Sequence, residues 1–312
     1  MISKNKNNKY YCSDYYKNYY KIIKLTMKDY TNFYHSYKLL DWIDINKIDW
    51  TYISENPRAA YLIETNMGKI TWRFLSINES MYYMLNKNKK DICWKYMSQN
   101  PNAQYLLKKN LDYIDWECLS LNHGAIDLIK QNQDKISWSY LSTNENAMDL
   151  LEQNLGWVDW EYICFNKSAI YILKKNIDKI NWRRLSANKN AIELLKQNID
   201  KIDWKFLSTN ENAMDLLEQN PDKINWSLLS INPNPRALEL LKQNQKKICW
   251  QNFCKNIGLF EIDYDFFKKR MDIIREEMMA YIFHPNRLSN LYYKYYGNKE
   301  EDMHISDFML EY

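Results

Sequence analysis

Ten tryptophans divide most of the chain into units of one length, and this spacing limits the possible folds more than any other feature. The first nine follow one another at intervals of 22 residues, and the tenth comes 24 later because Asn234 and Pro235 are inserted. A fixed period of this length indicates a repeat architecture. With Trp as position 0, the units begin at Trp50, Trp72, Trp94, Trp116, Trp138, Trp160, Trp182, Trp204, Trp226 and Trp250.

Other positions of the unit are nearly as constant. Position +3 is apolar, +4 is Ser or Cys, +6 is always Asn and +9 is mostly Ala. Positions +12 and +13 are an apolar pair, +16 is again Asn, and +20 is Ile or Val. The pattern predicts two short helices that bury one face each, because +3 and +4 fall on one side of a first helix with the Trp, and +9, +12 and +13 on one side of a second.

Polar residues mark where each helix begins and ends. The residue before Trp is of a helix-capping type in eight units: Asp49, Thr71, Asp115, Ser137, Asp159, Asn181, Asp203 and Asn225. Its oxygen can accept a backbone N–H bond at the start of a first helix running from the Trp to +5. Asn at +6 is expected to cap a second helix over +7 to +15. Asn at +16 is expected to end it in the left-handed conformation.

Helices this short are unstable alone, so neighbouring units must stack into a continuous core. The expected fold is all-α: an α-solenoid of about ten 22-residue helix-turn-helix repeats with N- and C-terminal helical caps. We divide the chain into a tail and cap (1–48), the solenoid (49–256) and a C-terminal helical cap (257–312). At roughly 8–10 Å per unit, the solenoid would be a rod or arc of about 80–100 Å.

A leucine-rich repeat is the rival fold, because its period can also be 22 residues. That fold needs alternating apolar residues on a strand. Here position +5 varies freely between Glu55, Gln99, Thr143 and Ala187. The strand alternation is therefore missing, and the helical interpretation is favoured.

Composition excludes several classes of protein. The net charge of +4, from 43 basic and 39 acidic residues, is too balanced for DNA binding by bulk electrostatics. No run of 18 apolar residues predicts a transmembrane span, and the polar N-terminus lacks a signal-peptide core. The six cysteines have no paired spacing, which indicates reduced thiols in a cytoplasmic protein.

No catalytic pattern is visible. The chain has no Walker loop, Rossmann fingerprint or nucleophile elbow, and its four histidines lie far apart without zinc-ligand spacing. We therefore expect no enzyme, no catalytic, cofactor or metal residues, and no small-molecule substrate. The chain is expected to be monomeric.

Function is expected in the surface positions that vary between units. On the second helix, +11 and +14 point away from the core, and on the first helix +2 is often aromatic. Packing against the next unit is the plainer explanation of +2, and a mixed solvated surface that of +11 and +14. The candidate partner-binding residues are Tyr61, Tyr83, Tyr105, Asp149, Glu152, Tyr171, Asp215 and Glu218 on the second helices, with Tyr52, Phe74, Tyr96, Tyr140, Tyr162 and Phe206 on the first.

These rows of surface residues at +2, +11 and +14 lead to a first hypothesis of a non-enzymatic scaffold that binds a protein partner. A second hypothesis is single-stranded RNA binding, in which the +2 aromatics stack on bases and lysines at +19 follow the phosphates. Those lysines are Lys69, Lys135, Lys179, Lys201 and Lys223. A third hypothesis is a substrate adaptor that acts through the C-terminal tail, where residues 266–283 are expected to form one longer amphipathic helix.

The unit from Ile202 to Asn220 resembles short Trp/Leu/Asn repeats in uncharacterised proteins of giant amoeba-infecting viruses of the mimivirus group. The resemblance covers roughly residues 36–256, and the segment from Glu276 to Arg287 is similar to a tail in such proteins. It implies a viral protein acting on host or viral partners, in the host cytoplasm, in the viral factory or as a virion component. It carries no catalytic residue.

Overall fold

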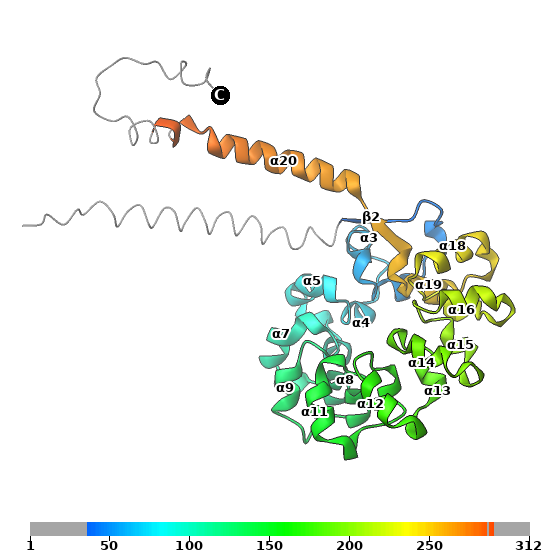
Figure 1. Cartoon of the computed structure of the whole chain (residues 1–312). Helices are drawn as coiled ribbons and strands as arrows, with labels where there is room; N and C mark the ends of the chain where they lie inside the picture. The colour runs from blue at the N-terminus through cyan, green and yellow to red at the C-terminus, as the bar shows by residue number, and fades with distance from the viewer. Residues whose placement is uncertain (1–35, 286, 290–312) are drawn as a thin grey trace, which may run out of the picture. The chain divides into compact units, whose positions relative to one another are not determined.

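The computed structural model describes residues 36–285 and 287–289 of the chain. These residues fall into two compact units, with the chain passing from one to the other after Ile262. The first holds the ten Trp-marked repeats, and the second holds the long helix α20, Tyr264–Ile282, capped by Asp263. The predicted all-α repeat class is confirmed, because most of the described chain is helical and only two three-residue strands occur in it (Figure 1).

Each repeat opens with a short first helix that begins at or near its Trp. In seven units a side-chain oxygen before the Trp accepts a backbone N–H bond, as predicted, whereas Thr71 makes no such bond. The sixth unit has only the 3-10 turn η9, Ile163–Phe165. The first helices are α2 (Trp50–Ile53), α4 (Trp72–Leu75), α6 (Trp94–Met97), α8 (Trp116–Ser120), α10 (Trp138–Ser142), α13 (Trp182–Leu185), α15 (Trp204–Leu207), α17 (Trp226–Leu229) and α19 (Trp250–Lys255).

A second helix follows in the first nine units. In five of them it begins with a separate 3-10 turn: η2 (Pro57–Ala59), η3 (Glu79–Met81), η5 (Pro101–Ala103), η7 (Glu145–Ala147) and η11 (Lys189–Ala191). The α-helical parts are α3 (Ala60–Glu64), α5 (Tyr82–Lys87), α7 (Gln104–Lys108), α9 (Ile126–Lys130), α11 (Met148–Gln153), α12 (Ile170–Lys175), α14 (Ile192–Lys196), α16 (Met214–Gln219) and α18 (Pro235–Gln243). Figure 1 shows α5, α7, α9 and α11 along the outer side of the array, with α4 and α8 inside them.

The Asn at +16 ends the second helix, but not in the left-handed conformation. Its φ is −131° at Asn154 and −133° at Asn176, so that expectation is wrong. Instead the side-chain amide donates to the carbonyl oxygen four residues earlier, as Asn154 Nδ2 does to Leu150 O over 2.9 Å. This bond satisfies a carbonyl left without a partner at the helix end, and it needs no positive φ.

A third element that the sequence pattern did not predict, a 3-10 turn at +17 to +19, leads to the next unit. These turns are η4 (Lys89–Asp91), η6 (Leu111–Tyr113), η8 (Leu155–Trp157), η10 (Ile177–Lys179), η12 (Ile199–Lys201), η13 (Pro221–Lys223) and η14 (Gln245–Lys247). The apolar residue at +3 is fully buried in every unit, with an exposed fraction of 0%. The Trp side chains are half-buried and pack against this core.

Buried Asn side chains at +6 join each unit to the preceding one. Nδ2 of Asn78 donates to the carbonyl oxygens of Ser54 and Asn56, both at 2.9 Å, and its Oδ1 accepts from Ser80 N at 3.0 Å. The amide contact to the +4 carbonyl recurs in all ten units. These contacts form an Asn ladder through the core, where a polar group without a partner costs about 1–3 kcal/mol.

The ladder closes on itself. Nδ2 of Asn56 in the first unit donates to the carbonyl oxygens of Cys254 (2.8 Å) and Asn256 (3.0 Å) in the tenth. The backbone N–H of Asp49 donates to Cys254 Sγ at 3.3 Å, a contact that a Ser hydroxyl accepts between other units. The repeats therefore form a closed ring in place of the expected rod or arc, and Figure 1 shows α3 beside α18 and α19 at the closure.

The tenth unit is assembled from both ends of the array. The C-terminal end supplies α19 and the 3-10 turn η15 (Ile257–Leu259), and the N-terminal end supplies the third turn η1 (Ile45–Lys47). A second helix is replaced by the strands β1 (Tyr37–Leu39) and β2 (Phe260–Ile262), which pair antiparallel with Leu39 opposite Phe260. The segment before residue 49, expected as a cap, thus completes the last unit, and residues 257–262 belong with the repeats.

Among residues 36–285 and 287–289, no helix combines the length and the apolar composition needed to cross a bilayer.

Candidate interaction surfaces

The lysines at +19 lie over the Trp rings of their own units. The distance from ammonium nitrogen to ring centroid is between 4.1 and 5.4 Å in seven units. The pairs are Lys69–Trp50, Lys135–Trp116, Lys179–Trp160, Lys201–Trp182, Lys223–Trp204, Lys247–Trp226 and Lys47–Trp250. Such contacts stabilise by about 0.5–1 kcal/mol at exposed sites. The fold itself therefore explains why Lys recurs there, without phosphate binding.

The aromatic side chains at +2 pack on one another along the first helices. Ring centroids are 5.9 Å apart for Tyr52 and Phe74, 5.6 Å for Phe74 and Tyr96, and 5.9 Å for Tyr140 and Tyr162. These five rings are half-buried. The stripe is therefore mostly occupied by contacts between neighbouring units.

Arginine side chains cover Tyr162 and one further member of the +2 set, Phe206. The guanidinium of Arg184, itself at +2, lies 4.4 Å from the Tyr162 ring centroid, and that of Arg183 lies 4.9 Å from Phe206. Phe206 is half-buried like the others. The six aromatics proposed from the sequence thus have partners within the ring, which leaves little ring face for stacking bases.

The tyrosines at +11 divide into two groups. Tyr61, Tyr105 and Tyr171 are exposed, with exposed fractions of 57%, 65% and 43%. Tyr83 is half-buried, and its buried hydroxyl has no hydrogen-bond partner among the described residues. The three exposed side chains belong to units 1, 3 and 6, so the structure does not bring them into one stripe.

The two acidic units differ from each other. Asp215 and Glu218 both bind the guanidinium of Arg236 from the next unit, and the hydrogen bond lowers the pKa of Asp215 below its ordinary value. Asp149 and Glu152 are exposed and form no ion pair within residues 36–285. One acidic pair is thus neutralised by the neighbouring repeat, and only the other is open to a partner.

Six exposed apolar side chains lie on the third turns, where the sequence analysis did not place them. We define the turn arc as the exposed apolar residues of η6, η8, η10 and η12. Its members and exposed fractions are Leu111 (49%), Tyr113 (59%), Leu155 (47%), Trp157 (67%), Ile177 (50%) and Ile199 (54%). Apolar residues at +17, together with aromatics at +19, were the available signal. They were missed because these positions were assigned to a connecting turn.

The aromatic members of the turn arc extend the Trp faces. Tyr113 stacks on Trp94 with centroids 4.9 Å apart, and Trp157 stacks on Trp138 at 6.2 Å. Each takes the place that Lys occupies in other units. These two units therefore present an aromatic ring to solvent where the others present an ammonium group.

The described cysteines are free thiols: Cys93, Cys118, Cys164, Cys249 and Cys254. Burial raises the pKa of Cys118 and Cys164, and raises that of Cys254 to about 11. A protonated thiol is a poor nucleophile and a poor metal ligand. In the described part of the chain, no three His, Cys, Asp or Glu side chains gather as metal ligands would.

The chain matches no protein-family model, no curated protein and no solved structure. The candidate surfaces are therefore identified from their geometry and chemistry.

Proposed function

We propose that the chain is a ring-shaped repeat scaffold that binds a protein partner through the turn arc. The observation that carries the proposal is the exposure of Trp157 and Tyr113 beside four aliphatic side chains on units 3, 5, 6 and 7. Large apolar patches on a protein surface mark interaction sites, and Trp and Tyr are enriched among the residues that dominate binding energy.

The distribution of contacts supports this choice over the stripes at +2 and +11. The +2 aromatics and the +19 lysines are engaged within the ring, and those two features were the basis for RNA binding. The turn arc places six exposed apolar side chains on consecutive or nearly consecutive units. The resemblance of the unit to repeats of mimivirus-group proteins supports a viral or host partner in the cytoplasm or viral factory.

The proposal is tested by site-specific cross-linking. A photoreactive phenylalanine analogue replaces Leu155 in the full chain, and the same analogue replaces Tyr105 on the outer helix α7 as a matched control. Irradiation in cells that express the chain is expected to yield a protein adduct from position 155 that is absent from position 105. Trp157→Ala in the position-155 chain should remove the adduct.

Thermal unfolding of Trp157→Ala separates lost binding from lost folding, because Trp157 also stacks on Trp138. Adducts that form equally at both positions, or that persist in folded Trp157→Ala, contradict a binding site on the turn arc.

A further inference from the structure

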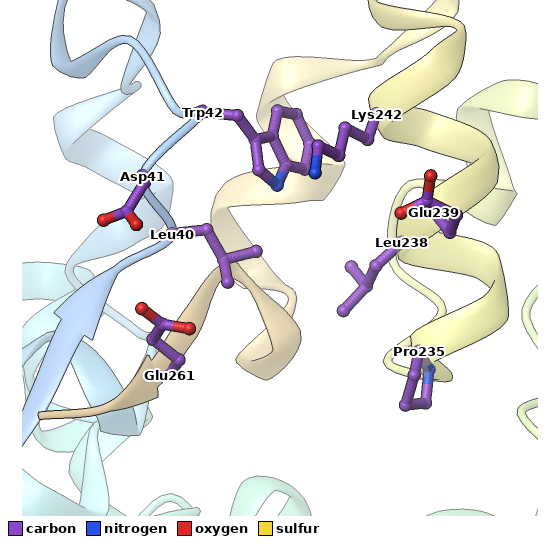
Figure 2. A pocket seen from close by; sticks show the side chains of 8 residues that line it. All are labelled: Leu40, Asp41, Trp42, Pro235, Leu238, Glu239, Lys242 and Glu261. Atoms are coloured by element: carbon purple, nitrogen blue, oxygen red, sulfur yellow. The ribbon is translucent and has the colours of Figure 1, made fainter. Parts of the chain in front are cut away.

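In the tenth unit the strands β1 and β2 replace a second helix, and a cavity lies between α18 and the chain around these strands. The cavity has a volume of about 340 Å³, close to the lower end of ligand-binding pockets. It lies between α18 and the segments that close the ring (Figure 2). Its lining residues are Leu40, Asp41, Trp42, Pro235, Leu238, Glu239, Lys242 and Glu261.

The junction between the eighth and ninth units shows what normally fills this position. There, Arg236 at the start of α18 binds Asp215 and Glu218, at +11 and +14 of the preceding α16. At this junction, positions +11 and +14 of a second helix therefore reach the second helix of the next unit. In the ninth unit, once the inserted pair is allowed for, these positions are Glu239 and Lys242, and both line the cavity.

Figure 2 shows Leu40 and Leu238 directed toward one another across the cavity, with the Trp42 indole beside Lys242. The cavity thus has an apolar interior and a charged rim.

Some charged side chains on the rim form ion pairs and others do not. Lys38 pairs with Glu261 at 3.2 Å and with Asp41 at 3.7 Å. Glu239 accepts a hydrogen bond from Gln243 but forms no ion pair with any residue of the described range. Glu239 is therefore the carboxylate available to an incoming cation, as Asp215 is to Arg236 between units 8 and 9.

We propose that this cavity binds a short amphipathic helix of a partner protein, which packs on α18 beside the strands β1 and β2. An aliphatic side chain of that helix enters between Leu40 and Leu238, and an Arg or Lys near its start pairs with Glu239. The contact repeats, between two molecules, the arrangement that joins α16 to α18 within the ring. This site is separate from the turn arc and does not depend on it.

The test uses a stapled, fluorescein-labelled peptide with the sequence of residues 234–244, which carries both the Arg and the apolar residues of a second helix. A staple is needed because so short a helix is unstable alone. Fluorescence anisotropy with the full chain should show saturable binding. Glu239→Lys should weaken binding about tenfold by placing like charges together, and a peptide with Glu in place of Arg should restore it.

Two further variants separate the cavity from general effects. Leu40→Trp fills the cavity and should abolish binding, with the ring intact by thermal unfolding. Asp149→Lys makes the same kind of charge reversal at +11 of a unit whose neighbouring second helix is present, and should leave binding unchanged. Absence of saturable binding at about 1 mM peptide, or equal loss in Asp149→Lys, overturns the proposal.

A photoreactive phenylalanine analogue at position 239 of the full chain, irradiated without peptide, tests whether another segment of the chain or a second copy fills the cavity. No intramolecular or chain-to-chain adduct is expected. An adduct to α20, or to a second copy of the chain, would show that the cavity is already filled and would overturn assignment to a partner helix.

Discussion

The side-chain amide of Asn56 donates to the carbonyl oxygen of Asn256 at 3.0 Å, across 200 residues of sequence. The same positions of adjacent units are joined between Asn78 and Asn56 at 2.9 Å. The closure thus uses the same hydrogen bonds as the internal junctions, except that the Asn144 amide contacts only the Ser120 carbonyl of the preceding unit. The ring has no exposed core face at which an open solenoid would need a cap.

The Asn ladder should dominate the stability of each junction. Asn188→Ala removes the amide that donates to the carbonyls of Cys164 and Asn166, and the oxygen that accepts from Asn190 N. Asn166 O keeps its bond from Ala169 N, whereas Cys164 O loses its amide donor. We expect a loss of about 2–4 kcal/mol in the free energy of unfolding, measured by urea denaturation. Asn190→Ala is the control, because Asn190 donates to Lys167 O at an exposed site and should cost under about 1 kcal/mol. Equal losses would contradict a special role for the buried ladder.

Removing one complete unit should open the ring. Deletion of residues 182–203 leaves nine units with an unchanged rotation per unit, so the first and last can no longer meet. Cys254, buried at the closure, should then react with iodoacetamide at the rate of an exposed thiol, whereas Cys164 inside the array stays protected. Mass spectrometry of tryptic peptides measures both. Continued protection of Cys254 would mean that nine units also close.

The closure should weaken at alkaline pH. Burial raises the pKa of the Cys254 thiol to about 11, above its value of about 8.5 in an unfolded chain. A group whose folded pKa is raised stabilises the fold fully below the unfolded pKa and loses that contribution as pH rises toward the folded pKa. Stability should therefore fall between about pH 8.5 and 11. Cys254→Ser keeps a hydrogen-bond acceptor, so its unfolding temperature should fall less than that of the unsubstituted chain over this pH range.

One unit lacks the cover over its Trp. The residue at +19 of the second unit is Asp91, and no cation lies over the Trp72 ring among the described residues. Asp91→Lys should place an ammonium group over Trp72 and stabilise the protein by about 0.5–1 kcal/mol. Asp91→Ser removes the acid without adding the cation and is the control. A gain of the same size from both variants would assign the effect to loss of the carboxylate.

The ion pair between units 8 and 9 should control the titration of Asp215. The Arg236 guanidinium lowers the pKa of this carboxyl, so the pair contributes at neutral pH and is lost as pH falls below about 4. Arg236→Gln should raise the pKa of Asp215 toward its ordinary value. NMR titration of the Asp215 carboxyl carbon in both chains measures the shift, and an unchanged pKa in Arg236→Gln would contradict control by the ion pair.

The sequence predicted the period, the first two helices and their caps because these depend on contacts within one unit. Asn144, for example, is predicted from local spacing to cap the start of a second helix, and its side chain accepts a backbone hydrogen bond there. Closure could not be predicted, because it depends on a small rotation added at every junction and on the meeting of Asn56 with Cys254. The exposure of the surface positions could not be predicted for a related reason. Tyr52 is covered by Phe74 of the next unit, whereas Trp157 stacks on Trp138 and stays exposed.

The division of the tenth unit between two chain ends has a consequence for assembly. During synthesis, the η1 turn cannot pack on Trp250 until the last repeat has been made. Until then the earlier units form an open array with two complementary end faces. Those faces are as suited to each other in two molecules as in one, which is the condition for domain swapping. Dilution favours single rings, while crowded nascent chains favour exchanged dimers of twice the circumference.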